Sequence, residues 1–530
     1  MTAPRSPYQA GSYSRHPRDW PADVSGVGRP HSVRGGSGGL ARTPVPSRET
    51  PRIALAAPAL AAFALALLAS PAFAQSADPT PRLIKVHYTA KDQQVLRYVN
   101  VPFDVPAGTT RIEIDLKYDK ANGENVVDLG LLEPGSLALG TSAFRGWTGG
   151  ERSAISVGAV DATPGYWPGP IQAGKWHVGL GLYKVGVKGV DVEVTVRTSS
   201  DPVMRVMPSL PARPNEPIRA GARWYSGALH AHTHNSDGAL SAQALAARAR
   251  AEGLDFLAIT DHNNTAYQRE AIDVPGLLTI VGEEVTTPGG HMNVWGLGGI
   301  RDFVDFRILP GDPAIIDLVK AVAARGALAG INHPYSSCVA CSWTHAVPAG
   351  IGTIEISGRE PEEMPRAVAL WDMLLRQGRR VTAIGVSDWH RGETPLGSAS
   401  VRVWANELST RAILDSIREG RVVVMIDGTT PPPDVVVSAG ARQARVGDTL
   451  ALAPGDAFAV TLAAEAPLYQ GARAELFWNG ERIATAPLGD GQVVFDRFAS
   501  TSGYLRVHVL AANGAPLAVT NPIWIRISAR

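Results

Sequence analysis

The segment from residue 221 to residue 425 alternates short apolar runs with amphipathic stretches, and this rhythm constrains the fold more than any other feature of the sequence. Short apolar runs bounded by turns predict buried strands, whereas apolar positions that recur every three or four residues predict helices. We expect strands at 256–260, 277–281, 291–297, 327–332, 352–357 and 381–386, and helices at 241–252, 313–324, 361–376 and 409–419. Strands that alternate with helices predict a parallel α/β domain, and we expect it to form a barrel.

Two β-rich regions flank this domain. Strand-like segments at 94–101, 111–118 and 190–196, separated by turn residues, predict a β-sandwich over residues 82–200. Five prolines between residues 201 and 219 then indicate a stiff connection between domains. A second β-sandwich is expected over 430–530, where Asn479-Gly480 and Asn513-Gly514 are hairpin-turn signals.

The beginning of the chain has the composition of a leader and an export signal. Residues 1–52 are rich in Arg, Ser, Gly and Pro, which predicts disorder. Residues 53–74 contain an apolar run over 53–69, followed by Ala72-Phe73-Ala74, the pattern of a signal-peptidase site. From this pattern we expect cleavage after Ala74 and a periplasmic or secreted product. That product should have no stable membrane span, because no later apolar run is long enough to cross a bilayer. A membrane anchor is the alternative.

Composition excludes some classes of function. The 50 Lys and Arg residues balance 49 Asp and Glu without a basic stripe, so we expect no nucleic acid partner. Two cysteines exclude a disulfide-framework scaffold. Cys338 and Cys341 favour a short-loop disulfide in an exported protein, with free thiols or a metal contact as the alternatives. The sequence leaves the oligomeric state open.

Histidines concentrate in the α/β segment, since eight of the 13 lie between residues 230 and 390. They and several carboxylates recur where predicted strands end, and those ends converge on one face of a parallel barrel. On extended backbone, residues i and i+2 point the same way, so His230 with His232, and Asp388 with His390, can each aim two side chains at one point. Imidazole and carboxylate are ligands that suit Zn, Mn or Fe. The alternative is that each histidine is a structural residue satisfied by hydrogen bonds.

The order of these residues resembles the motifs of the PHP (polymerase and histidinol phosphatase) superfamily. The resembling strings are Leu229–Gly238 (LHAHTHNSDG), Thr260–Asn263 (TDHN), Gly282–Glu284 (GEE), His291, Asn332–Pro334 (NHP) and Ser387–His390 (SDWH). The resemblance implies a distorted seven-stranded barrel with a cluster of two or three divalent metal ions. The ligands that it implies are His230, His232, Asp237, His262, Glu284, His291, His333, Asp388 and His390.

Two further residues are predicted to act in catalysis. Asp261, next to His262, is a candidate base or proton shuttle that could also only orient an imidazole. His234 departs from the motif and is expected to be a proton donor at the pocket mouth rather than a ligand. Tyr335, Trp343 and Trp389 could line an aromatic pocket, although packing is the more common role of such residues.

The expected function is that of an exported metal-dependent hydrolase acting on a small-molecule ester. A metal-bridging hydroxide would attack a phosphoester or a carboxylic or carbamate ester, since divalent ions lower the pKa of bound water to about 7. Within the superfamily, export and flanking β domains look most like the carbaryl-hydrolase-like (CehA/McbA) metallohydrolases. The alternative function is a glycan- or surface-binding protein in which an inactive PHP barrel is only a scaffold.

Overall fold

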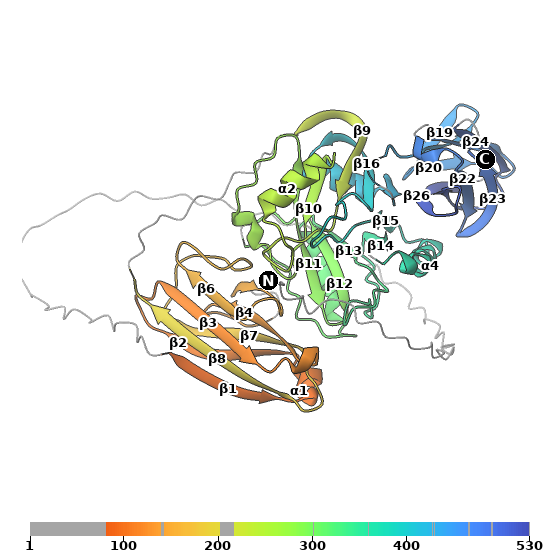
Figure 1. Cartoon of the computed structure of the whole chain (residues 1–530). Coiled ribbons are helices and arrows are strands. Elements are labelled where there is room, and N and C mark those ends of the chain that lie inside the picture. Colours follow the sequence, from red (N-terminus) through yellow and green to blue (C-terminus); the bar gives the residue numbers. More distant parts are fainter. Residues whose placement is uncertain are drawn as a thin grey trace, which may run out of the picture. The chain divides into compact units, whose positions relative to one another are not determined.

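Strands outnumber helices in the computed structural model (Figure 1). It describes residues 81–138, 143–201, 217–299, 301–358, 360–426, 428, 430–464, 467–488 and 491–528. The expected leader, the expected signal peptide and most of the proline-rich connection lie outside these residues. None of the helices in the described part of the chain is both long and apolar enough to cross a membrane.

The first β-rich region forms two four-stranded antiparallel sheets around one apolar core. Their orders are β1-β8-β3-β6 and β2-β7-β4-β5. In β3, Ile112, Ile114 and Leu116 alternate with more exposed residues and point into that core, as a half-buried strand requires. The strands are β1 (Arg82–Tyr88), β2 (Tyr98–Val105), β3 (Arg111–Tyr118), β4 (Val126–Leu132), β5 (Phe144–Trp147), β6 (Ala154–Gly158), β7 (Gly174–Lys184) and β8 (Val190–Ser199).

The strand predicted at 94–101 is wrong at its start, because Ala90–Val95 form helix α1. Thr89 caps this helix: its hydroxyl accepts a hydrogen bond from the Asp92 N–H, and the Asp92 carboxylate accepts one from the Thr89 N–H. This reciprocal capping box stabilises the first turn of a helix. The strand, β2, therefore begins only at Tyr98.

The α/β segment forms one mixed sheet whose order runs β15-β14-β13-β12-β11-β10-β9-β16-β17. The strands are β9 (Arg219–Ala228), β10 (Phe256–Ile259), β11 (Leu278–Thr287), β12 (Gly290–Trp295), β13 (Leu328–Ile331), β14 (Thr353–Ser357), β15 (Thr382–Gly385), β16 (Ser400–Leu408) and β17 (Val422–Met425). The helices are α2 (Ala242–Ala251), α3 (Ala314–Ala324), α4 (Met364–Arg376) and α5 (Thr410–Arg418). All six predicted strands and all four predicted helices are present, with ends that differ by a few residues.

The expectation of a purely parallel sheet is wrong. β9, β10 and β11 run parallel, as do β13, β14 and β15, but β12 is antiparallel to both of its neighbours. Pro288 and Gly289 alone separate β11 from β12, and so short a connection permits only an antiparallel pair. In the described residues the ladder order ends at β15, so a closed barrel is not confirmed.

The C-terminal strands continue the same sheet, because β17 pairs with β26. A four-stranded sheet, β19-β18-β21-β24, shares an apolar core with these added strands. Both hairpin signals are confirmed, since Asn479-Gly480 joins β22 to β23 and Asn513-Gly514 joins β25 to β26. The strands are β18 (Asp434–Ala439), β19 (Arg442–Arg445), β20 (Thr449–Leu452), β21 (Ala457–Ala463), β22 (Arg473–Trp478), β23 (Glu481–Pro487), β24 (Gln492–Phe498), β25 (Gly503–Leu510), β26 (Pro516–Thr520) and β27 (Ile523–Ile527).

Candidate metal centre

The structure brings together all nine residues predicted as ligands. They come from β11, β12 and the segments that follow β9, β10, β13 and β15. Their ligand atoms form four groups, and within each group these atoms lie within 4.8 Å of one another. The groups are His232/Asp237/His262/His390, His230/His333/Asp388, His230/His232/Glu284 and His262/Glu284/His291. Two of the groups share no residue, so the cluster offers at least two separate positions for an ion.

Backbone pairing explains why the two i, i+2 pairs meet. Ala231 and Trp389 form an isolated parallel bridge, and the His232 N–H donates to the Trp389 carbonyl at 2.9 Å. The bridged residues point away, so the ligand pairs on either side of each one face the same direction. A second bridge joins His262 to Glu284. The side chains at the strand ends therefore converge as the sequence predicts, although Glu284 lies within β11 rather than after it.

Two of these residues adopt backbone conformations that side chains rarely occupy. His333 has a φ of 21° and Asp388 a φ of 48°. A non-glycine residue with positive φ costs free energy, on the order of 1–3 kcal/mol, and persists where surrounding contacts enforce it. At His333 one such contact is visible, because its N–H donates to the Glu355 carboxylate at 2.7 Å.

Glu284 lies at the centre of the cluster. Its Oε1 lies 3.1 Å from His291 Nδ1 and 3.2 Å from His333 Nε2, and it accepts a hydrogen bond from Asn332 Nδ2 at 2.8 Å. Its Oε2 is 2.9 Å from His262 Nδ1 and 3.4 Å from the Nε2 atoms of both His230 and His232. The side chain is 1% exposed. One buried carboxylate therefore contacts five imidazoles.

The charges within the cluster shift its pKa values in opposite directions. Burial raises the pKa of Glu284, but His230, His262 and His291 outweigh it and hold that pKa well below its usual range. Burial, together with the neighbouring His390 and His262, lowers the pKa of His232 to about 3. Burial likewise lowers the pKa of His291 to about 4. Although burial opposes it, the neighbouring carboxylates raise the pKa of His262 to about 9 and also raise the pKa values of His230, His333 and His390. The carboxylate and two of the imidazoles are thus in the forms that bind metal ions, and the other four imidazoles would release a proton on binding one.

The donor atoms of the cluster fit divalent cations. His291 Nε2, Asp237 Oδ1 and Glu284 Oε2 are buried without a well-formed hydrogen bond in the described part of the chain. The Nε2 atoms of His230 and His232 face each other at 3.1 Å, and Asp388 Oδ1 lies 3.2 Å and 3.1 Å from them. Buried polar atoms without partners are costly, and shared coordination of cations would satisfy them. Their role as ligands is a prediction that this geometry supports.

Glu355 is a site residue that the sequence analysis missed. Its Oε1 lies 2.8 Å from His230 Nδ1, and its Oε2 accepts the His333 N–H. It thereby fixes the orientation of two predicted ligands, the usual task of a carboxylate behind a metal-binding histidine. The sequence did contain a sign of this role, because a glutamate inside the buried strand Thr353–Ser357 needs a buried partner.

Asp261 lies behind the cluster. Its carboxylate accepts hydrogen bonds from Thr233 N at 2.7 Å, Thr233 Oγ1 at 2.5 Å and Ser236 Oγ at 2.7 Å. Ser236 Oγ is in turn 3.4 Å from His232 Nδ1. These contacts favour the orienting role of Asp261 over that of a base or proton shuttle.

His234 does not join the cluster. Its Nε2 lies 2.8 Å from Glu270 Oε1, and its side chain is 39% exposed. Glu270 also accepts a hydrogen bond from the Ala242 N–H at the first turn of α2. His234 thus contacts Glu270, which in turn contacts the start of a helix, and the proton-donor role predicted for His234 gains no support from this geometry.

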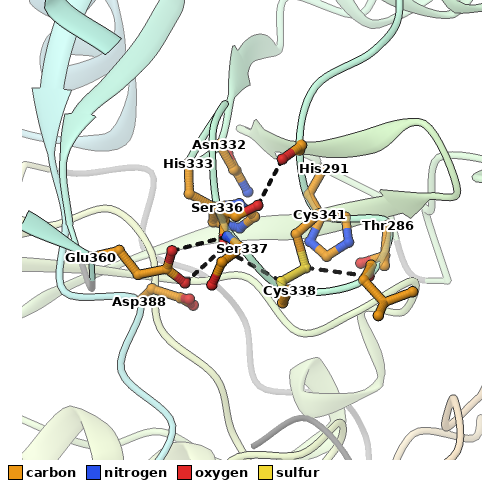
Figure 2. Close-up of a disulfide and its surroundings, with 12 residues drawn as sticks. Thr286, His291, Asn332, His333, Ser336, Ser337, Cys338, Cys341, Glu360 and Asp388 are labelled. Carbon is orange, nitrogen blue, oxygen red and sulfur yellow. Dashed lines mark hydrogen bonds between the residues drawn. A yellow bond between two sulfur atoms is a disulfide. The ribbon is translucent and has the colours of Figure 1, made fainter. Parts of the chain in front are cut away.

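A cavity of about 290 Å³ opens beside the cluster. One wall consists of predicted ligands, and another includes Pro334–Cys338, Cys341, Gly358, Glu360 and Glu362–Met364. The expected disulfide between Cys338 and Cys341 is confirmed and lies beside His291 and His333 (Figure 2). Of the three aromatic residues considered above, Tyr335 lines this cavity.

Trp389 instead packs against the protein. Its Nε1 donates to the Thr394 carbonyl at 3.0 Å, and the Arg248 guanidinium lies over its ring. The ring is therefore held by internal contacts, which favours the packing role for this residue.

Comparison with known proteins identifies one domain. The model of the PHP domain matches residues 228–324. A solved two-domain protein from Bacteroides vulgatus, described as containing a predicted PHP-like metal-dependent phosphoesterase, is 17% identical, with a TM-score of 0.33 over 59% of this chain and 100% of its own. No protein of curated function matches the chain. Residues 228–324, which carry six of the nine clustered side chains, are therefore similar to a PHP domain.

Proposed function

We propose that this protein is a metal-dependent hydrolase whose reaction centre is the nine-residue cluster. The observation that carries the proposal is the convergence of imidazole and carboxylate atoms from six separate segments, several without a well-formed hydrogen bond, beside a cavity of about 290 Å³. The match of residues 228–324 to the PHP domain supports it. The substrates we propose are small-molecule phosphoesters or carboxylic and carbamate esters, which the cavity has room to admit.

The clustered residues would bind the metal ions, and their neighbours would orient them. Two or three divalent ions, Zn, Mn or Fe, would supply Lewis acidity and lower the pKa of bound water. His232, Asp237, His262 and His390 would hold one ion, and His230, His333 and Asp388 a second, while Glu284 and His291 complete the set. Glu355 and Asn332 keep the ligands oriented through the hydrogen bonds described above. The ester would occupy the cavity, which several of the predicted ligands line.

We also propose that the protein is exported, as the sequence of residues 53–74 indicates. The Cys338–Cys341 disulfide supports this, because disulfides persist in oxidising compartments. Mass spectrometry of the protein recovered from the periplasm or medium of an expressing cell would place the mature N-terminus at Gln75. A chain that starts before residue 53 would contradict the proposal.

The experiment that tests the function combines metal analysis with a substrate panel. Protein reconstituted with Zn²⁺ or Mn²⁺ is expected to retain two or three ions per chain and to hydrolyse at least one of p-nitrophenyl phosphate, bis-p-nitrophenyl phosphate, p-nitrophenyl acetate and an aryl N-methylcarbamate. A chelator should abolish the activity, and added metal should restore it. Which substrate reacts distinguishes phosphoesterase from carboxylic or carbamate ester hydrolysis. Fewer than one ion per chain would contradict the proposal.

Two histidines of the same region provide a matched pair for this experiment. His291→Ala removes a clustered imidazole and should reduce the bound metal, whereas His234→Ala removes one that contacts Glu270 instead. His234→Ala should therefore keep the metal content of the unaltered protein. Equal metal loss in the two variants would argue against the assignment of the cluster.

Replacing Glu355 with glutamine is expected to weaken the binding of divalent metal. The variant keeps the size of the side chain but removes the charge that faces His230 Nδ1 at 2.8 Å. Loss of such an orienting carboxylate lowers metal affinity by roughly 10- to 100-fold. Competition with a metal-binding dye measures the change.

Glu419→Gln serves as its control, since that side chain is 56% exposed and pairs with Arg421 at the end of α5. The control should bind metal as the unaltered protein does. An unchanged affinity in Glu355→Gln would show that Glu355 does not support the ligands.

A further inference from the structure

The loop that carries Asp237 is held through its backbone. This loop follows His232 and runs from Thr233 to Gly238. The carbonyl groups of residues 234–237, four in succession, each accept a hydrogen bond from a side chain outside the loop. Buried backbone carbonyls need partners, and a loop cannot obtain them from a neighbouring strand. The position of Asp237 therefore depends on the side chains that supply these hydrogen bonds.

Two of the four hydrogen bonds come from Arg152. Its Nη2 donates to the His234 carbonyl at 2.5 Å, and its Nη1 donates to the Ser236 carbonyl at 3.2 Å. Arg152 lies between β5 and β6, in the N-terminal sandwich formed by β1 to β8. The guanidinium is planar and rigid, so one side chain holds both carbonyls and fixes the spacing between them.

A second segment of the sandwich contacts the residue between these two carbonyls. The Gly165 N–H donates to Asn235 Oδ1 at 3.1 Å. Gly165 has a φ of 89°, and a Cβ at this position would lie 2.6 Å from the Asn235 carbonyl oxygen. Only glycine therefore lets the two segments approach this closely. The Asn235 carbonyl accepts its own hydrogen bond from Asn264 Nδ2 at 3.1 Å, and this nitrogen also lies 3.4 Å from the Trp147 carbonyl oxygen of β5.

The fourth carbonyl, that of Asp237 itself, is held from the α/β segment. It accepts a hydrogen bond from Arg391 Nη2 at 2.5 Å, and Arg391 directly follows His390. The Asp237 Oδ1 atom lies 3.3 Å from His390 Nε2 and 3.7 Å from His262 Nε2. A ligand must be held within about 0.5 Å of its productive position, so a shift of this loop would remove Asp237 from its group.

The sandwich also faces two predicted ligands directly. Glu151 and Tyr183 line a cavity of about 30 Å³ together with Asp237 and His262. A cavity of this size has room for little more than a water molecule. The sandwich therefore lies against this side of the cluster.

We propose that Arg152 is a positioning residue for Asp237, and that the N-terminal sandwich is thereby a structural part of the metal centre. The inference rests on the proposed metal-dependent function and adds to it the part of the chain on which one ion depends. Asp237 occurs in only one of the four groups of ligand atoms. No residue of the loop 233–238 occurs in the group formed by His230, His333 and Asp388. Loss of Arg152 should therefore weaken the binding of one ion and spare another.

Competition with a metal-binding dye for Zn²⁺, carried out on the whole protein, tests the inference. Arg152→Gln removes both hydrogen bonds, so the affinity for one ion per chain is expected to fall by about 10- to 100-fold, the usual effect of losing a group that orients a ligand. The remaining ions should bind as in the unaltered protein. Arg152→Lys can still donate to one carbonyl and should lose less affinity. Gly165→Ala displaces the same loop through a different contact, and the double variant Arg152→Gln/Gly165→Ala should still hold the other ions.

Arg197→Gln is the control, because Arg197 lies on β8 of the same sandwich and pairs with Asp115 instead. It should bind every ion as the unaltered protein does. A general loss of stability would weaken all ions alike, so equal weakening in Arg152→Gln would overturn the proposal, as would an unchanged affinity. If Arg152→Gln does not fold, the selective weakening must occur in Arg152→Lys, or the proposal fails.

Failure of the proposed function has a different signature. Fewer than one Zn²⁺ ion per chain in the unaltered protein would contradict the metal-dependent function itself. An unaltered protein that retains its ions, with variants that lack the selective loss, would leave that function intact and overturn only the role of Arg152.

Discussion

Glu284→Gln is expected to lower kcat by roughly 10- to 100-fold or more, because losing a carboxylate that supports metal-binding histidines lowers metal affinity or activity by about that factor. Glu284 contacts five imidazoles and is 1% exposed, so no solvent replaces the lost charge. The variant should also retain less metal. Metal content and kcat, measured on the same preparation, check both effects.

The neighbouring glutamate provides the control. Glu283 is also buried, but its Oε2 accepts a hydrogen bond from the Val304 N–H at 2.7 Å, away from the cluster. Burial raises the pKa of Glu283 well above its usual value, so the side chain is already neutral and glutamine is a close replacement. Glu283→Gln should keep both metal and activity. Full metal content and full activity in Glu284→Gln would contradict the assigned centre.

Asp128→Asn is expected to stabilise the protein, and to do so increasingly as pH rises. Asp128 is 8% exposed, and its Oδ1 has no hydrogen-bond partner among the described residues. Burial raises its pKa from 3.8 to about 7, although Arg97 and His262 oppose this. The folded state therefore binds this proton more tightly than the unfolded state does. The contribution of Asp128 to the free energy of unfolding is therefore highest below pH 3.8 and declines as pH rises to about 7. Above that pH the contribution is lost completely.

The amide of the variant cannot ionise, so the variant does not lose stability in this way as pH rises. Its advantage in the free energy of unfolding should be about 4 kcal/mol at pH 8 and smaller by about 2–3 kcal/mol at pH 5, because one pKa unit corresponds to 1.36 kcal/mol. Urea denaturation at the two pH values measures the difference. Asp191→Asn, a side chain 93% exposed on the same sandwich, should show no such pH-dependent gain. An advantage independent of pH would show that Asp128 is ionised in the folded protein.

Much of the local structure follows from the sequence because its causes are local. Ser241 caps α2 by accepting a hydrogen bond from the Ala244 N–H, and Asn479-Gly480 makes a hairpin whichever sheet surrounds it. The missed helix α1 also had a local cause, the capping box formed by Thr89 and Asp92. The direction of β12 was likewise visible in the two-residue Pro288-Gly289 connection. Both predictions were wrong because they rested on the pattern of apolar residues and ignored the residues that favour helix caps and turns.

The sequence by itself determined most of the residues that gather at the candidate centre, because ligand types at successive strand ends meet wherever the strands lie side by side. Asp237 and His291 were identified only through the resemblance to the PHP motifs. Only the tertiary structure decided how each one is used. The separation of His234 from the cluster, the placement of Asp261 behind it and the support from Glu355 depend on contacts between segments far apart in the chain. Such contacts are set by packing across the whole fold, and no local pattern of residues encodes them.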